Sequence, residues 1–206
     1  MMARLLLVVL SCLLTSCIAV RGDDIKIDSK WPLEGVIATK SVSLSVTGNF
    51  SSGTSTEPTN PRAMQLIEGQ AQKAYMDSAL FSQVSLAKEQ SDLKAEVRVT
   101  EEGSKALAGI SGFISGFSMG LIPGYVHATL TMETVFKNQA GSEIGSIKKS
   151  ESVSLWIQLF LVLAMPFKDN PNHVIRDIYY DLNRATLDQA LKDGFLFRPY
   201  AASANR

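Results

Sequence analysis

The sequence predicts an α+β domain with a mostly antiparallel sheet and helices on one face. Three stretches alternate apolar and polar residues at period two, which is typical of half-buried strands: 42–47, 93–100 and 126–133. Two pairs, Asn60-Pro61 and Asn170-Pro171, precede helical patterns of apolar residues. Asparagine is a good N-cap and proline suits the first helical turn, so both pairs mark helix starts. Helices and antiparallel strands in this order favour an α+β layer.

The composition is that of a globular protein and excludes some partners. Of 206 residues, 46% are apolar and 19% are charged, and the formal net charge is +0. A nucleic-acid-binding surface or a polybasic membrane patch would need an excess of Lys and Arg, which the sequence lacks. The two cysteines are Cys12 and Cys17. The domain that follows them must be stabilised by its core, because it holds no cysteine for a disulfide bond.

The first 17 residues resemble a bacterial lipoprotein signal. Arg4 precedes an apolar run at 5–14 that is too short to span a bilayer. The run leads into Leu14-Thr15-Ser16-Cys17, which resembles the lipobox. The resemblance implies a signal peptide at 1–16 and three acyl chains on Cys17, which is a stable anchor.

We expect residues 17–35 to hold the lipidated cysteine and a tether. Ile18 is not the aspartate that retains enteric lipoproteins at the inner membrane, so the resemblance implies sorting to the outer membrane of a Gram-negative cell. The alternatives are an ordinary signal peptide with an incidental cysteine, or cleavage near Ala19.

A single domain is expected at 36–197, followed by a loose tail at 198–206. The helix that begins at Pro171 is expected to end near Gly194, a C′ glycine. The elements predicted before that helix are strands at 42–47, 81–86, 93–100, 126–133 and 143–152, a helix at 61–79, a loop at 48–60, and turns at 88–92 and 138–142. On the strand at 143–152, apolar and charged residues share a face, which indicates a position near an edge of the sheet.

The glycine-rich segment 106–126 is the most unusual stretch of the chain. It holds no charge, and a small residue recurs at every fourth position: Ala108, Gly112, Gly116, Gly120 and Gly124. On a helix this spacing forms a ridge that allows another backbone to approach closely. A second uncharged run, 153–167, is its expected neighbour, and the two could form a helical hairpin. Three interpretations of the ridge stay open: insertion into a membrane, packing inside the domain, or a surface that docks on a membrane or partner.

No pattern in the sequence indicates catalysis, a cofactor or a metal site. His127 and His173 lack the spacing of zinc ligands, and no nucleophile elbow or phosphate loop is present. The carboxylate pairs Glu101-Glu102 and Asp177 with Asp181 are interpreted as solvated faces. We therefore expect a protein that is not an enzyme.

Residues 63–195 resemble a group of small uncharacterised envelope lipoproteins of Gram-negative bacteria. More distantly, the order of elements is similar to the amino-terminal domain of TolB and to LpoB-type lipoproteins. The matching pieces are Ser78-Ala79-Leu80-Phe81 with Val84, Asp92-Leu93, Gly120-Leu121-Ile122-Pro123, a hairpin around Gly141, and the run 161–166. The resemblance implies proteins that contact envelope machinery and catalyse nothing.

Together these features predict a lipid-anchored, non-catalytic binding or accessory protein, held on the outer membrane and facing the periplasm. Its expected partners are the membrane, through the acyl chains, and an envelope protein. The alternative is a membrane-inserting or oligomerising lipoprotein that uses the glycine ridge, and an envelope hydrolase ranks third. Self-association stays open, and nucleic acid is not an expected partner.

Overall fold

The computed structural model describes residues 16–27, 31–32, 38–86, 91–118, 122–158 and 170–196. It confirms the α+β class, because one mixed, mostly antiparallel sheet carries packed helices. The strands are β1 (Ser16–Arg21), β2 (Lys40–Ser52), β3 (Ser55–Pro58), β4 (Phe81–Ser85), β5 (Leu93–Gly103), β6 (Gly124–Asn138) and β7 (Glu143–Gln158). The helices are α2 (Pro61–Asp77), α3 (Lys105–Phe117) and α4 (Pro171–Lys192).

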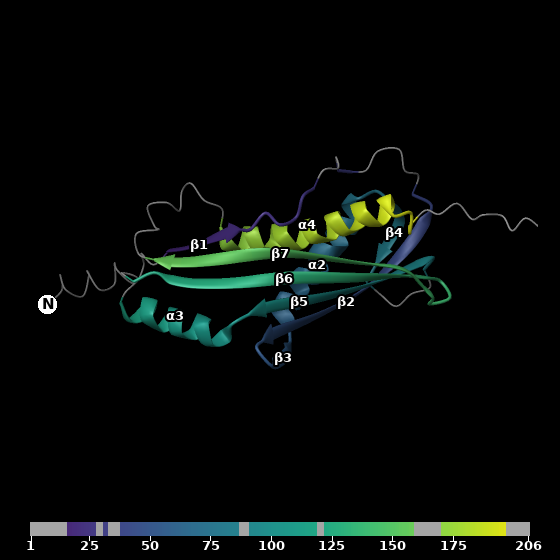
Figure 1. The fold of residues 1–206 in the computed structure, drawn as a ribbon. Coiled ribbons are helices and arrows are strands. Elements are labelled where there is room, and N and C mark those ends of the chain that lie inside the picture. The colour runs from purple at the N-terminus through teal and green to yellow at the C-terminus, as the bar shows by residue number, and fades with distance from the viewer. Residues whose placement is uncertain are drawn as a thin grey trace, which may run out of the picture.

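The sheet has the strand order β1-β7-β6-β5-β2-β3, and β4 pairs with β2. Strand β2 is parallel to β4 and β5, whereas the other pairs are antiparallel. Parallel neighbours require a crossover, and α2 supplies it between β2 and β5. Helices α2 and α4 pack against each other and cover one face of the sheet, while α3 lies at one end, against β6 and β7 (Figure 1).

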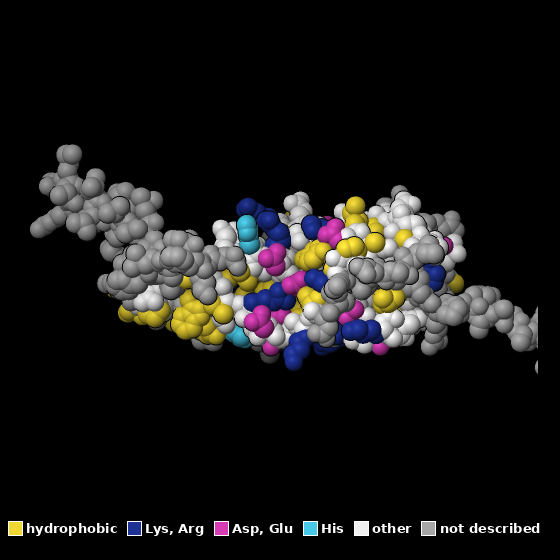
Figure 2. All heavy atoms as spheres, turned by 90° about the horizontal axis from the view of Figure 1, so that it is seen from above, with side chains coloured by type: hydrophobic (Ala, Val, Ile, Leu, Met, Phe, Trp, Pro, Cys, Tyr) yellow, Lys and Arg dark blue, Asp and Glu magenta, His cyan; other side chains and the backbone are white. Residues whose placement is uncertain are grey.

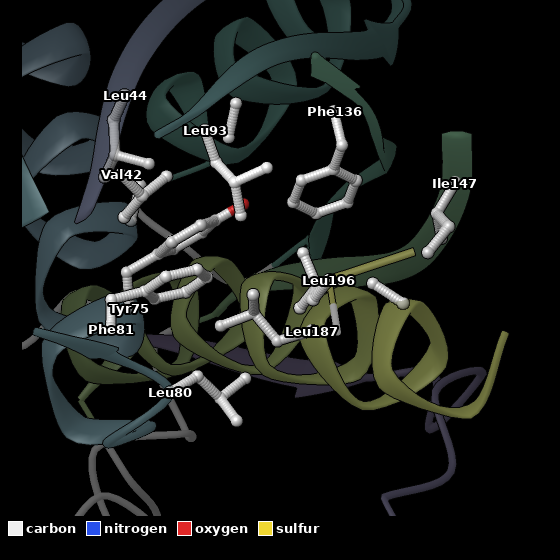
Figure 3. Packing of buried hydrophobic residues seen from close by; sticks show 13 residues of the cluster. Val42, Leu44, Tyr75, Leu80, Phe81, Leu93, Phe136, Ile147, Leu187 and Leu196 are labelled. Atoms are coloured by element: carbon white, nitrogen blue, oxygen red, sulfur yellow. The ribbon is translucent and has the colours of Figure 1, made fainter. Parts of the chain in front are cut away.

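The core fills the space between the sheet and the pair α2 and α4. Period-two alternation turns the apolar side chains of each strand to one face, where they meet the helices. At one end Phe136 lies beside Leu187 and Leu196, and Tyr75 stacks on Phe81 (Figure 3). The second half of the core joins the two helices to the middle strands through Ile67, Val97, Val99, Leu130, Met132, Val153, Ile178 and Leu182.

Both predicted helix starts are confirmed by the capping geometry. The side-chain oxygen of Asn60 accepts a hydrogen bond of 2.9 Å from the backbone N–H of Ala63. Asn170 accepts one of 2.9 Å from the N–H of Asn172. Helix α4 ends at Lys192, and Gly194 follows with φ +74°, a left-handed conformation that glycine adopts without strain.

Two predicted segments differ from the structure. The predicted loop 48–60 contains the end of β2 and the whole of β3, which form a hairpin through Gly53. Residues 153–158 of the second apolar run are strand, because they complete the pairing of β7 with both β6 and β1. These six residues rule out the helical hairpin as predicted, and 159–167 lie outside the described residues. The prediction that the strand at 143–152 lies near an edge is confirmed, because β7 is second from the edge of the sheet, next to β1.

The predicted tether at 17–35 also differs from the structure. Residues 17–21 belong to β1, which pairs antiparallel with β7 along its whole length. The sequence did not predict this strand, because a short edge strand needs little pattern of its own where a longer strand has an unpaired edge. The predicted tail at 198–206 lies outside the described residues.

Candidate functional site

The candidate site is the end of the sheet where β1 and β6 begin and β7 ends. In the strand register Cys17 lies opposite Ile157, and Ile157 lies opposite Gly124, so three strands reach this end together. Helix α3 packs against the same end of β6 and β7 (Figure 1). We call this region, made of residues 16–20, α3, 122–128 and 153–158, the tip.

Helix α3 presents three large apolar side chains outward. Ile110, Phe113 and Phe117 share one face of the helix and are 57%, 73% and 84% exposed. Two serines of α3 face the sheet: Ser111 Oγ accepts a 2.6 Å hydrogen bond from the N–H of Tyr125, and Ser115 is buried. A surface helix of a water-soluble domain usually has the opposite arrangement. Folding alone does not account for the apolar outer face of α3.

Further apolar side chains are exposed on the neighbouring strands and the residues before them. Ile122, Tyr125 and Trp156 are exposed, and the rings of Tyr125 and Trp156 lie 4.7 Å apart between centroids. The Tyr125 hydroxyl is 3.2 Å from Ser154 Oγ. Figure 2 shows hydrophobic side chains gathered at this end of the molecule, and charged side chains farther along it. Among the described residues, the exposed large hydrophobic side chains outside the tip are Met76 and Leu86.

Apart from Lys105, the first residue of α3, the tip lacks charged residues. Asp, Glu, Lys and Arg do not occur at 16–20, 106–132 or 152–158. Exposed apolar patches of this kind on a soluble domain usually mark an interaction surface. The tip is therefore suited to an apolar partner and not to an ionic one.

Cys17 lies in β1 at the tip. Its side chain is half-buried, and this burial raises the pKa of the thiol above its ordinary value. A thiol in this state is mostly protonated at neutral pH. The position of Cys17 is thus a better indication of its role than the reactivity of its thiol.

A buried carboxylate holds β1 and the residues that follow it. The Glu151 side chain is 0% exposed and accepts hydrogen bonds from the Arg21 guanidinium at 3.2 Å and from the backbone N–H groups of Asp24 at 3.0 Å and Ile25 at 3.1 Å. Arg21 also pairs with Asp181 of α4. We call this set of residues the clasp. It ties the strand that carries Cys17 to both β7 and α4.

Asp24 adds a second fixed point next to the clasp. Its carboxylate accepts hydrogen bonds from the backbone N–H and the hydroxyl of Ser152, at 2.9 and 2.6 Å. These bonds favour the charged form and hold the pKa of Asp24 below its usual value. Residues 16–25 are therefore part of the folded domain.

No protein family and no curated protein matches the chain. Solved structures that are similar to it include two of the PelC dodecamer from Paraburkholderia phytofirmans, one of them a variant. The variant is 9% identical, with a TM-score of 0.37, and the match covers 83% of this chain and 95% of that one. The other is also 9% identical, with a TM-score of 0.33 and coverage of 84% and 94%.

The structure divides the predicted glycine ridge between a helix and a strand. Ala108, Gly112 and Gly116 lie in α3, Gly124 is the first residue of β6, and Gly120 lies outside the described residues. The five small residues therefore do not form one ridge on a helix, and that prediction was wrong. Pro123, which cannot continue a helical hydrogen-bond pattern, stands directly before the strand.

The other residues singled out in the sequence have structural surroundings. His127 Nδ1 lies 3.0 Å from Ser154 Oγ, and His173 lies in the first turn of α4. Glu101 was expected on a solvated face but accepts a hydrogen bond from the Tyr179 hydroxyl, and Asp181 was expected there too but pairs with Arg21. In the part of the chain that the structure describes, no three His, Cys, Asp or Glu side chains gather as metal ligands would.

Sequence reasoning missed the clasp and the outward face of α3. The shared face of Ile147, Lys149, Glu151 and Val153 was interpreted as an edge pattern, although it could also have indicated a buried carboxylate with a distant partner. The spacing of Ile110, Phe113 and Phe117 was visible, but its direction was not, because a helix pattern does not say which face meets the protein.

Replacing Gly124 with valine should loosen α3 from the sheet. A Cβ at this position would lie 3.1 Å from Ser115 Cβ and 3.2 Å from Ser111 Oγ, so the helix must move. We expect the amides of α3 to exchange faster with solvent, which hydrogen-exchange mass spectrometry measures.

The control for Gly124→Val is Gly109→Ala. A Cβ at Gly109 meets nothing within 4 Å, and alanine favours a helix over glycine by about 1 kcal/mol. This variant should slow exchange in α3. Equal exchange rates in the two variants would show that Gly124 does not set the contact between helix and strand.

Proposed function

We propose that this chain is a lipid-anchored protein of the Gram-negative cell envelope that is attached through Cys17 and acts by binding, not by catalysis. The observation that supports this best is the place of Cys17, in β1 at the tip, beside uncharged and exposed apolar side chains. Cleavage before Cys17 would make the acylated residue the first residue of an edge strand.

The clasp would fix the direction in which the acyl chains leave the domain. Because β1 is paired with β7 and Arg21 is fixed by Glu151 and Asp181, the acyl chains would leave the domain at the tip. Three acyl chains hold a protein stably in a membrane. The tip would then face the bilayer, and the turn at Gly141, at the other end of β6 and β7, would point away from it.

The outer face of the sheet is the surface we propose for a protein partner. It carries a row of polar side chains on β5, β6 and β7, including Arg98, Thr131 and Ser150. If the domain is held by its tip, this face would be upright relative to the membrane. It would then be accessible to other envelope proteins in the periplasm. Outer-membrane sorting, as Ile18 implies, belongs to the same proposal.

A second candidate is a lipoprotein whose copies associate through α3. The outward Phe113 and Phe117, whose rings stack 6.1 Å apart, favour some apolar partner for this helix. Among the described residues no helix has the length and apolarity needed to cross a membrane. The thirteen residues of α3 are about 20 Å long, so insertion as a spanning helix is not part of the proposal.

The proposed anchor predicts that Cys17→Ser abolishes acylation. In a Gram-negative host grown with labelled palmitate, the parent chain should carry label, and its intact mass should match a chain beginning at Cys17 with three acyl groups. Cys17→Ser should carry no label and remain as the longer precursor.

Cys12→Ser is the matched control for this experiment. Cys12 lies in the expected signal peptide, so this variant should be labelled and cleaved like the parent. Label retained in Cys17→Ser, or a mature chain that begins near Ala19, would refute the anchor.

A further inference from the structure

We propose that the outer face of α3, together with Tyr125 and Trp156, enters the phospholipid leaflet that holds the acyl chains of Cys17. This second attachment rests on the proposed anchor and gives the domain one fixed orientation on the membrane. The lipid leaflet would thus cover the apolar surface. The alternative is that a second copy of the chain covers it, and the experiment below distinguishes the two.

The first support is the exposed apolar face of α3. Its serines meet the strands, and its aromatic side chains point away from the protein. An interfacial helix lies in the membrane plane with its apolar face about 5–10 Å deep, at the boundary of headgroups and acyl chains. Phe113 and Phe117 are the side chains that would reach this depth.

The second support is the kind of residue beside the helix. Tyr125 and Trp156 combine an apolar ring with a polar group, and such residues are enriched where a protein crosses from lipid to water. The Tyr125 hydroxyl already contacts Ser154, on the polar side of the ring. Exposed Tyr125 and Trp156 thus lie next to polar side chains of the strands, as residues at a lipid–water boundary do.

The third support is the distance to the anchor. Cys17 is paired with Ile157, and Ile157 with Gly124, so two strand spacings of about 4.8 Å separate β1 from β6. Acyl chains on Cys17 would therefore enter the bilayer about 10 Å from the start of β6. The clasp prevents the domain from swinging away, and Lys105, at the first position of α3, is the one charged residue of the tip.

The test uses the fluorescence of Trp156. The chain has two tryptophans, so a Trp31→Phe background leaves Trp156 as the reporter. The acylated protein is reconstituted into phosphatidylcholine vesicles whose lipids carry bromine near the headgroup, and quenching is compared with unbrominated vesicles. We expect clear quenching of Trp156, reduced by about twofold or more when Phe113→Ser and Phe117→Ser are combined, because the apolar face then binds less well.

Met76→Ser is the matched control. Met76 is 60% exposed on α2, away from the tip, so its replacement removes exposed apolar area without changing the proposed contact. Quenching in this variant should equal that of the background. Urea unfolding should be the same for the double phenylalanine variant and the background, which shows that the serines have not altered the fold.

The outcomes separate this inference from the proposed function. If the intact mass shows three acyl chains but Trp156 is not quenched, the lipid contact is refuted and the anchor stands. If the mass shows no acyl chain, the proposed anchor fails, whatever the quenching. If Trp156 is not quenched and the phenylalanine variant converts an oligomer in detergent to a monomer by light scattering, a second copy covers this face and the inference is overturned.

Discussion

Replacing Glu151 with alanine is expected to lower the free energy of unfolding by about 3–5 kcal/mol, the usual cost of removing one partner of a buried ion pair. The Glu151 side chain is fully buried and accepts hydrogen bonds from Arg21, Asp24 and Ile25. Without it, two backbone N–H groups and part of a guanidinium lose their acceptor. Urea unfolding followed by circular dichroism measures the change.

The same variant should free the strand that carries Cys17. Arg21 would keep Asp181 as a partner, but the residues after it would lose their attachment to β7. We therefore expect a protease to cleave the Glu151→Ala variant near residues 21–25 while it leaves the parent intact. Glu143→Ala is the control, because Glu143 is exposed on the same strand and its loss should change stability by less than about 0.5 kcal/mol. Similar stability losses in both variants would contradict the role of the clasp.

Replacing Phe136 with alanine should destabilise the protein by about 3–5 kcal/mol. Phe136 is fully buried where β6 meets α4, beside Leu187 and Leu196 (Figure 3). Its removal costs the transfer of an aromatic ring into water and leaves a cavity that the sheet and helix cannot close. The unfolding midpoint in urea should fall with an unchanged slope.

Phe113→Ala is the matched control for Phe136→Ala. Phe113 is 73% exposed, so alanine there should change the free energy of unfolding by no more than about 0.5 kcal/mol. A large loss of stability from Phe113→Ala would mean that α3 buries this ring within the domain, and the tip would then have no free apolar face. Comparing the two variants thus distinguishes residues that stabilise the fold from residues that are available to bind a partner.

The sequence predicted most of the fold because its signals are local. Strand alternation at 93–100 and 126–133, the capping pairs at Asn60 and Asn170, and the C′ position of Gly194 all depend on neighbouring residues. β3 and β1 were missed for the converse reason. Each is short, and each is a strand because a longer strand, β2 or β7, pairs with it.

The candidate site could be predicted only in part. The uncharged segment 106–126 and Cys17 were each recognisable, but their meeting at one end of the sheet depends on register over more than a hundred residues. The regular spacing of small residues suggested one long ridge. The chain instead leaves the helix before Pro123, because strand pairing with β7 uses the backbone groups of Gly124 and the residues that follow.

The sequence by itself determined the α+β class, the helix starts, the uncharged segment and the lipobox-like pattern at 14–17. Each of these follows from residue types within a few positions of one another. Only the tertiary structure decided that Glu151 is buried against Arg21, that α3 turns Phe113 and Phe117 outward, and that Cys17 lies at the same end of the sheet as α3. Those facts depend on which surfaces come together when the sheet forms, and contacts between distant residues have no local pattern.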